Sequence, residues 1–296
     1  MVPLPASYPA APLLGSMRLH LVPTPQPVAY TTTACWEHYV LGDHRQTVTT
    51  RHLTLAIRPL TEGHYELDLA ADPPALTTGS ALQPVEELAL RLAPLYARLL
   101  VQAAPTGQLL AVRNQAQLVD TWHTLKQTLV ESAAAADQLT PQFIAFVDQQ
   151  LATPAPLLRS LHYDYLYQGL ISPFYHQPLT GPRTREFAQF LPGLSLWFDE
   201  AVVPLPAPAP APDELALRLE GRLDAARTNV AVLGRRLAAE VTAGGGAAPA
   251  GTPRASYEAT YALDQATGLP QRVELSVDLR WGEVYNRHYT LTIDRV

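Results

Sequence analysis

The sequence predicts an α+β fold in which one large, curved antiparallel sheet packs over a central group of helices. Apolar and polar side chains alternate between Met17 and Leu69, and again between Leu194 and Ile293. This period of two is typical of strands with one buried face. The segment between the blocks carries leucines at helical spacing, and only these helices can cover the apolar faces of both strand blocks. We therefore expect about eight to ten strands, from both ends of the chain, to share one sheet.

The N-terminal strand block follows a proline-rich start. Prolines interrupt every pattern in residues 1–16, which we expect to form a flexible arm. Alternation begins at 17–21 and resumes at 28–32. Two further runs, 52–58 and 65–69, flank a glycine-containing turn and predict a hairpin.

The middle of the chain is predicted to be helical. A helix should begin at Pro84, and its leucines continue at helical spacing to Leu99, with a kink or break at Pro94. A short strand is expected at 109–112. Asn114 should then cap a helix that continues to residue 129.

Prolines also introduce the next two helices, predicted over 140–151 and 154–165. The chain after Pro173 reads as irregular until a strand at 194–198. A Pro/Ala-rich spacer at 204–213 favours an extended conformation.

The last part of the chain should return to the sheet. A strand is expected at 215–223 and a helix at 224–241, followed by a flexible loop at 242–254. The strongest strand pattern then fills 257–293, as a meander with turns near residues 264–270 and 282–283.

These elements predict a single α+β domain over residues 17–296. The alternative is two domains, 17–203 and 214–296, joined by the spacer. A sheet wrapped over helices is similar in fold to bacterial lipoprotein carriers. No sequence motif supports membership of that family.

Composition and charge weigh against several classes of function. The 21 basic and 27 acidic residues leave a net charge of −6, and no stretch concentrates the arginines, so nucleic acid is not expected as a partner. The lone Cys35 allows no internal disulfide. No apolar run approaches the roughly 20 residues of a transmembrane segment. Without a basic stretch ahead of an apolar core at the start, the expected location is the cytoplasm.

Catalytic motifs are not recognisable in the sequence. There is no phosphate-binding loop, nucleophile elbow, zinc helix or calcium loop, so neither a cofactor nor a metal is expected. His52 and His64 could meet across the predicted hairpin, and Asp120 and His123 lie one helical turn apart. A hydrolase-like enzyme with a His/Asp site assembled from separate segments is therefore an alternative.

The strongest candidate site is the aromatic segment 161–176. Rings with polar tips suit a pocket wall or a protein interface, because one part of each side chain is apolar and the other is polar. The candidate residues for a ligand or partner surface are His162, Tyr163, Tyr167, Tyr175 and His176.

The sequence thus favours a non-catalytic binding or assembly module. Such a module would hold a hydrophobic small molecule or dock a protein partner. A third hypothesis is that the protein is a subunit of a larger multiprotein machine, which would agree with the proline-rich arm and spacer. If Tyr163 and Tyr167 face outward, their replacement by alanine should weaken binding with little loss of stability.

Overall fold

The structure is a computed structural model. It describes residues 19–79, 81–131, 140–171, 174–175, 179, 181, 183–191, 193–203 and 214–296, without the side chains of residues 62, 85 and 189. The predicted arm at 1–16 and the spacer at 204–213 lie outside the described residues.

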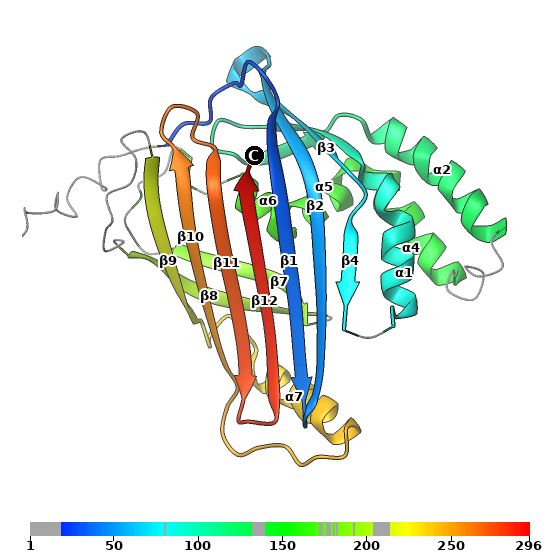
Figure 1. Ribbon diagram of the computed structural model, residues 1–296, viewed down its shortest axis with the longest axis vertical. Coiled ribbons are helices and arrows are strands. Elements are labelled where there is room, and N and C mark those ends of the chain that lie inside the picture. The colour runs from blue at the N-terminus through cyan, green and yellow to red at the C-terminus, as the bar shows by residue number, and fades with distance from the viewer. Residues whose placement is uncertain are drawn as a thin grey trace, which may run out of the picture.

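Twelve strands in the described part of the chain form one antiparallel sheet (Figure 1). Their order across the sheet is β6-β5-β3-β2-β1-β12-β11-β10-β9-β8-β7, and β4 also pairs with β2. The strands are β1 (Val28–Val40), β2 (Asp43–Pro59), β3 (Tyr65–Ala71), β4 (Ala75–Thr78), β5 (Arg98–Ala103), β6 (Leu109–Val112), β7 (Arg183–Leu191), β8 (Leu194–Val203), β9 (Glu214–Leu223), β10 (Arg254–Asp264), β11 (Pro270–Trp281) and β12 (Tyr285–Arg295).

The two strand blocks meet where β1 pairs with β12, which confirms the predicted fold class. Trp36 of β1 lies opposite Tyr289 of β12 on one side and Thr47 of β2 on the other. Strands β8 and β9, on either side of the spacer, also pair directly, with Phe198 opposite Leu223. The first and last strands, β1 and β12, therefore lie at the centre of the sheet, and β6 and β7 form its two edges.

The helices lie at the inner face and at the ends of the sheet. They are α1 (Pro84–Leu92), α2 (Gln115–Glu131), α4 (Pro141–Ala152), α5 (Pro154–Tyr163), α6 (Tyr165–Leu170) and α7 (Val230–Ala243), with 3₁₀ helices η2 (Thr61–Gly63) and η3 (Ala93–Tyr96). Figure 1 shows α1, α2 and α4 gathered on the β4 side, α7 at the lower end, and β7 and β8 crossing behind the long strands.

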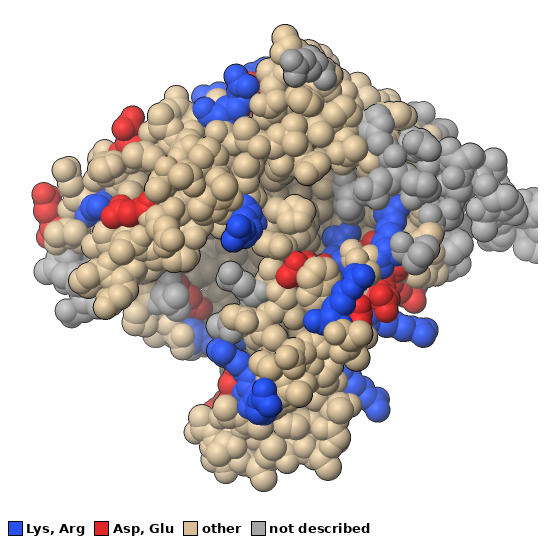
Figure 2. Space-filling view, turned by 180° about the vertical axis from the view of Figure 1, so that it is seen from behind, with Lys and Arg blue, Asp and Glu red and all other residues tan. Residues whose placement is uncertain are grey.

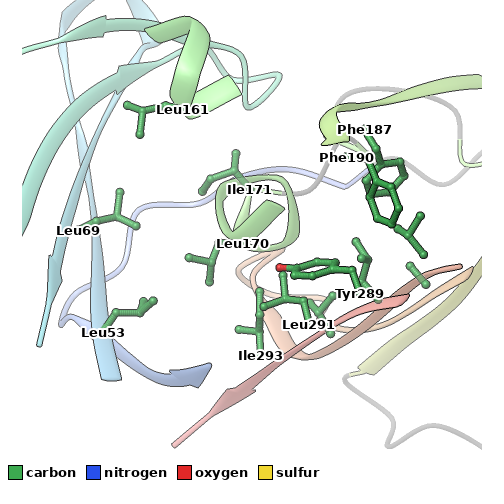
Figure 3. Close-up of a cluster of buried hydrophobic side chains, with 14 of the residues drawn as sticks. Leu53, Leu69, Leu161, Leu170, Ile171, Phe187, Phe190, Tyr289, Leu291 and Ile293 are labelled. Atoms are coloured by element: carbon green, nitrogen blue, oxygen red, sulfur yellow. The ribbon is translucent and has the colours of Figure 1, made fainter. Parts of the chain in front are cut away.

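Helix α6 fills part of the concave side of the sheet. In Figure 3 its Leu170 lies between Leu53 of β2 and Phe187 of β7, so apolar side chains from both flanks of the sheet surround it. The helix approaches β12 closely at Gly169, where an added Cβ would lie 2.7 Å from Cδ1 of Ile293. This short helix thus joins the two flanks of the curved sheet into one core.

Two predicted elements are wrong, one of them because the same residues fit more than one pattern. The leucines at 95 and 99 match a helical repeat, but Leu99, Val101 and Ala103 also alternate, and they are buried in β5 against β3. The break at Pro94 is confirmed, since α1 ends at Leu92 and η3 follows. Residues 183–191, predicted to be irregular, form β7, paired with β8.

The predicted start of α2 is confirmed, since the helix begins at Gln115, directly after Asn114. The Asn114 side chain bonds β5 instead of the first turn: Oδ1 accepts from Leu100 N at 3.0 Å, and Nδ2 donates to Arg98 O at 3.0 Å. Helix α7 begins at Val230 rather than at Asp224, and Asn229 Oδ1 accepts from Val232 N at 3.1 Å.

Asp68 is expected to make stability depend on acid pH. Its carboxylate accepts two bonds from Arg98, at 2.9 and 2.8 Å, and its side chain is 9% exposed. The bond from Arg98 lowers the pKa of Asp68. The stabilisation is therefore present above the ordinary aspartate pKa and is lost as pH falls through the lowered pKa. Asp68→Asn should lower the free energy of unfolding by about 1–2 kcal/mol at neutral pH.

Urea unfolding at pH 7 and at pH 3 or below tests this prediction. The difference in the free energy of unfolding between wild type and Asp68→Asn should shrink in acid. As the Asp68 carboxylate becomes protonated, both proteins come to carry an uncharged group there. Asp294→Asn is the control, since that side chain is 49% exposed and its contact with Arg272 is 3.6 Å long. If this difference in the free energy of unfolding stays constant with pH, the stabilisation does not come from the charge of Asp68.

Candidate functional site

A cavity of about 780 Å³ lies where both edges of the sheet reach the helices. We call it the seam cavity. Its walls come from the turn before β6 (106–109), from α5 and α6 (161–171), and from β7 and β8. Because β6 and β7 are the opposite ends of the strand order, the sheet curls far enough for both its edges to border one cavity.

Three of the five predicted site residues line the seam cavity: His162, Tyr163 and Tyr167. Tyr175 does not, because its ring is fully buried and its hydroxyl donates to Gly268 O at 3.0 Å. His176 lies outside the described residues. The roles of all five residues stay a prediction.

The helix that carries the tyrosines is broken in two, which their spacing alone did not predict. Asp164 ends α5 and caps α6, with Oδ1 accepting from Leu166 N at 2.8 Å and Tyr167 N at 3.2 Å. Tyr163 and Tyr167 therefore stand on two different helices. They still line one cavity, because the break occurs inside its wall.

Both tyrosines in the cavity stay protonated over the physiological range. The negative charge of Glu186 raises the pKa of Tyr163, and burial, followed by the charge of Asp164, raises the pKa of Tyr167. The phenols are consequently neutral hydroxyl groups that can donate hydrogen bonds. They offer a ligand polar contacts beside apolar ring surface.

A buried ion pair forms another part of the seam cavity wall. Arg185 Nε lies 2.7 Å from Glu200 Oε2, and the two side chains are 8% and 3% exposed. The guanidinium also stacks over the ring of Tyr257, 5.2 Å from its centre. No local sequence pattern predicted this pair, because residues 183–191 show no clear strand alternation.

Beyond the seam cavity, part of the concave face of the sheet is open to solvent. Trp36 and Thr49 point inward, yet they are partly exposed, as are their outward-facing neighbours Cys35 and Thr50. Farther along the same inward face, Leu53 and other apolar residues are buried. Figure 2 shows a hollow in the face opposite to that of Figure 1. We call this open part of the concave face the inner hollow.

Asp164 lies at the junction of α5 and α6. Desolvation by the surrounding protein raises its pKa, an effect that outweighs two backbone hydrogen bonds and the charge of Arg51. Helix α6 carries residues of both spaces, since Tyr167 lines the seam cavity and the ring of Tyr165 lies 6.3 Å from that of Trp36.

Aromatic rings from four elements pack together beside the inner hollow; Trp36 and Tyr165 are partly exposed, and the other three are buried behind them. The ring of Trp36 lies 4.5 Å from Tyr289, 5.3 Å from Phe190 and 6.3 Å from Tyr165, measured between centroids. The fifth ring, Phe187, lies 5.3 Å from Tyr165. We call these five residues the aromatic wall. They come from β1, α6, β7 and β12, so no local sequence pattern could have joined them.

The two histidines of the predicted hairpin, His52 and His64, do not meet. His52 Nδ1 lies 3.0 Å from Thr31 Oγ1, whereas His64, at the other end of the hairpin, contacts Gln102 at 2.9 Å. Asp120 and His123 are exposed on α2. Within the described ranges, no group of three or more His, Cys, Asp or Glu side chains is placed to hold a metal ion.

The described helices include none that is long and apolar enough to cross a membrane. Outward-facing charges on β11 pair with each other as expected for a solvated face, with Arg272 and Glu274 at 2.6 Å.

Comparisons with known proteins add little to this description. No protein-family model and no curated protein matches the sequence. A solved structure of lipovitellin, described for its lipid–protein interactions, aligns with 91% of this chain and covers 25% of its own chain. The sequence identity is 8% and the TM-score is 0.41. The chain thus spans about a quarter of the lipovitellin chain.

Two structures of MucB with MucA, one of them named as from Pseudomonas aeruginosa, align over 90% of this chain and 89% of theirs. Their identities are 9% and 10%, and their TM-scores are 0.14 and 0.13. Likenesses this weak leave the function to be argued from the residues themselves.

Proposed function

We propose that this protein is a non-catalytic binding protein that holds a hydrophobic small molecule against the aromatic wall. The observation that carries the proposal is Trp36, an inward-facing indole that stays partly exposed although it touches three other aromatic rings. Burying the remaining exposed surface of such a ring is favourable by about 25 cal/mol per Å² of apolar area.

The shape of the site supports a small ligand. Ligand pockets in proteins typically enclose about 300–1,000 Å³, and the seam cavity, at about 780 Å³, falls in this range. Helix α6 carries Tyr167 of the seam cavity and Tyr165 of the aromatic wall, so an apolar molecule against that wall would have a second concave space nearby. Aromatic surface with a few hydroxyl groups is the lining that such pockets use.

The test uses N-phenyl-1-naphthylamine, an uncharged dye whose emission rises in apolar surroundings. We expect saturable binding to the full chain, with energy transfer from Trp36 to the bound dye. Trp36→Phe should remove most of that transfer, and Trp197→Phe, which changes an indole of the seam cavity wall, should remove less. Absence of saturable binding would overturn the proposed function.

If energy transfer to the dye is unchanged in Trp36→Phe but lost in Trp197→Phe, the dye does not bind at the aromatic wall. Thermal unfolding of both variants, which should stay close to wild type, ensures that the readings come from folded protein. The conservative change to phenylalanine keeps an aromatic ring at each position and so limits the loss of packing.

Tyr163 and Tyr167 supply a second test of the site. Tyr167→Ala should weaken dye binding about threefold to tenfold, because the ring lines the seam cavity on the helix that also carries Tyr165 of the aromatic wall. Tyr163→Ala, farther toward Glu186, should weaken it less. Tyr39→Ala is the control, since this residue faces outward on β1, one position before the inward-facing Val40. Equal effects at positions 39 and 167 would contradict this role.

A further inference from the structure

A cation stands on the aromatic wall, and we propose that the ligand carries an oxyanion that this cation, Arg287, binds. The inference rests on the proposed function and narrows it to one class of molecule, an apolar body with a carboxylate, sulfonate or phosphate group. It depends on the position of Arg287, on its surroundings and on its lack of a carboxylate partner.

The guanidinium of Arg287 stacks on the aromatic wall. Its Cζ lies 5.0 Å from the centre of the Trp36 ring and 5.8 Å from that of Phe190. On the sheet, Arg287 lies opposite His38 of β1 and beside Leu279 of β11. A guanidinium stacked by its face keeps its N–H groups in its own plane, where they can donate to an anion.

No described carboxylate neutralises this guanidinium at contact distance. Ion pairs within 4.0 Å account for many arginines of the described chain, but Arg287 makes none. Its Nε is buried and lacks a hydrogen-bond partner among the described residues. Glu240, whose pKa Arg287 helps to lower, lies instead 3.6 Å from His38 and 4.0 Å from Arg236.

A cation without a carboxylate in contact is costly in a partly buried aromatic site, because Glu240 acts on it only from beyond ion-pair distance while the site removes water. Arg185, on the other flank of the sheet, shows the usual solution, with Glu200 at 2.7 Å. At Arg287 a bound oxyanion would supply that counter-charge, and two oxygens of one group can accept from one guanidinium. The wall beside it would hold the apolar part of the same molecule.

The test compares two dyes that differ in one group. 8-Anilino-1-naphthalenesulfonate has the ring system of N-phenyl-1-naphthylamine and adds a sulfonate. We expect the anionic dye to bind at least about tenfold more tightly to wild type, the effect of one charge-assisted hydrogen-bonded contact. Arg287→Met should abolish that preference and change the affinity for the neutral dye by less than about twofold.

Two matched variants control for charge and for folding. Arg287→Lys keeps the charge but loses the planar fork, so it should restore part of the preference. Arg280→Met removes a cation from the outward face of the neighbouring strand, where Arg280 pairs with Asp278, and should leave the preference intact. Thermal unfolding of each variant shows whether it is folded.

A measurement on wild type alone keeps the proposal testable if Arg287→Met does not fold. Raising sodium chloride from about 0.05 to 0.5 M should weaken binding of the anionic dye and leave the neutral dye no weaker. Inorganic phosphate, at an ionic strength matched with chloride, should not displace the anionic dye, because the site binds the oxyanion together with an apolar body.

The outcomes separate this inference from the proposed function. Binding of both dyes with equal affinity would overturn the anionic class and leave the hydrophobic binding function standing. Binding of neither dye would overturn both. Complete displacement by inorganic phosphate would show a site for free anions and would overturn the amphipathic ligand.

Discussion

Replacing Arg185 with methionine while Glu200 stays in place is expected to lower the free energy of unfolding by about 3–5 kcal/mol. The Glu200 carboxylate is 3% exposed, and its hydrogen-bonded cationic partner is Arg185 Nε, 2.7 Å away. Removing the arginine leaves a charge that water cannot reach. The change also removes the stacking of the guanidinium on Tyr257.

The matched control is the double variant Arg185→Met with Glu200→Leu. Because it removes both charges and fills the same space with apolar atoms, its stability should return to within about 1–2 kcal/mol of wild type. Urea unfolding of the four proteins of this cycle measures the difference. A double variant as unstable as the single one would show that packing, rather than the uncompensated charge, accounts for the loss.

Gly268→Ala is expected to lower the free energy of unfolding by about 2–4 kcal/mol, through two separate costs. The residue has φ +73°, a conformation that side chains disfavour. An added Cβ would also lie only 2.3 Å from the carbonyl oxygen of His20 and 3.0 Å from the ring of Tyr175. Backbone cannot yield as a flexible side chain can, so the turn or the 19–22 segment must move.

Gly63→Ala isolates the conformational cost, because Gly63 has the same φ of +73° with nothing within 4 Å of the added atom. It should cost only about 1 kcal/mol. Equal losses at positions 63 and 268 in thermal or urea unfolding would show that the close approach to His20 is unimportant.

The close approach at Gly268 matters because three distant segments meet there. Val22 N donates to Thr267 O at 3.2 Å, Leu19 forms a bridge with Tyr175, and Tyr175 donates to Gly268 O. We expect the 19–22 segment to lose protection from amide hydrogen exchange in Gly268→Ala.

The sequence determined which residues face the core wherever one pattern dominated. In β11, Val273, Leu275 and Val277 are buried. Arg272 and Glu274, which alternate with them along the strand, form an outward ion pair. Period-two alternation leaves one solution for such a strand, since a shift of one residue would expose its whole apolar face. That both strand blocks share one sheet was only the simplest way to cover their apolar faces with one group of helices, and the pairing of β1 with β12 decides it.

Tertiary structure decided the elements whose residues satisfy two patterns. Leu99 fits a helix with Leu95 and a strand with Val101, and pairing of β5 with β3 selects the strand. Likewise, the break at Asp164 depends on the fold around it, because the leucines and tyrosines on both sides suit one continuous helix.

The candidate site divides in the same way. Tyr163 and Tyr167 could be found from composition, because a dense run of aromatic residues with polar tips is a local signal. The aromatic wall and Arg287 could not, since Trp36 and Arg287 are distant in sequence and become neighbours only where β1 pairs with β12. Alternation in a sequence records which face of a strand is apolar. Whether the rest of the chain covers that face or leaves it open, as at Trp36, depends on how far the sheet curves and where the helices pack against it.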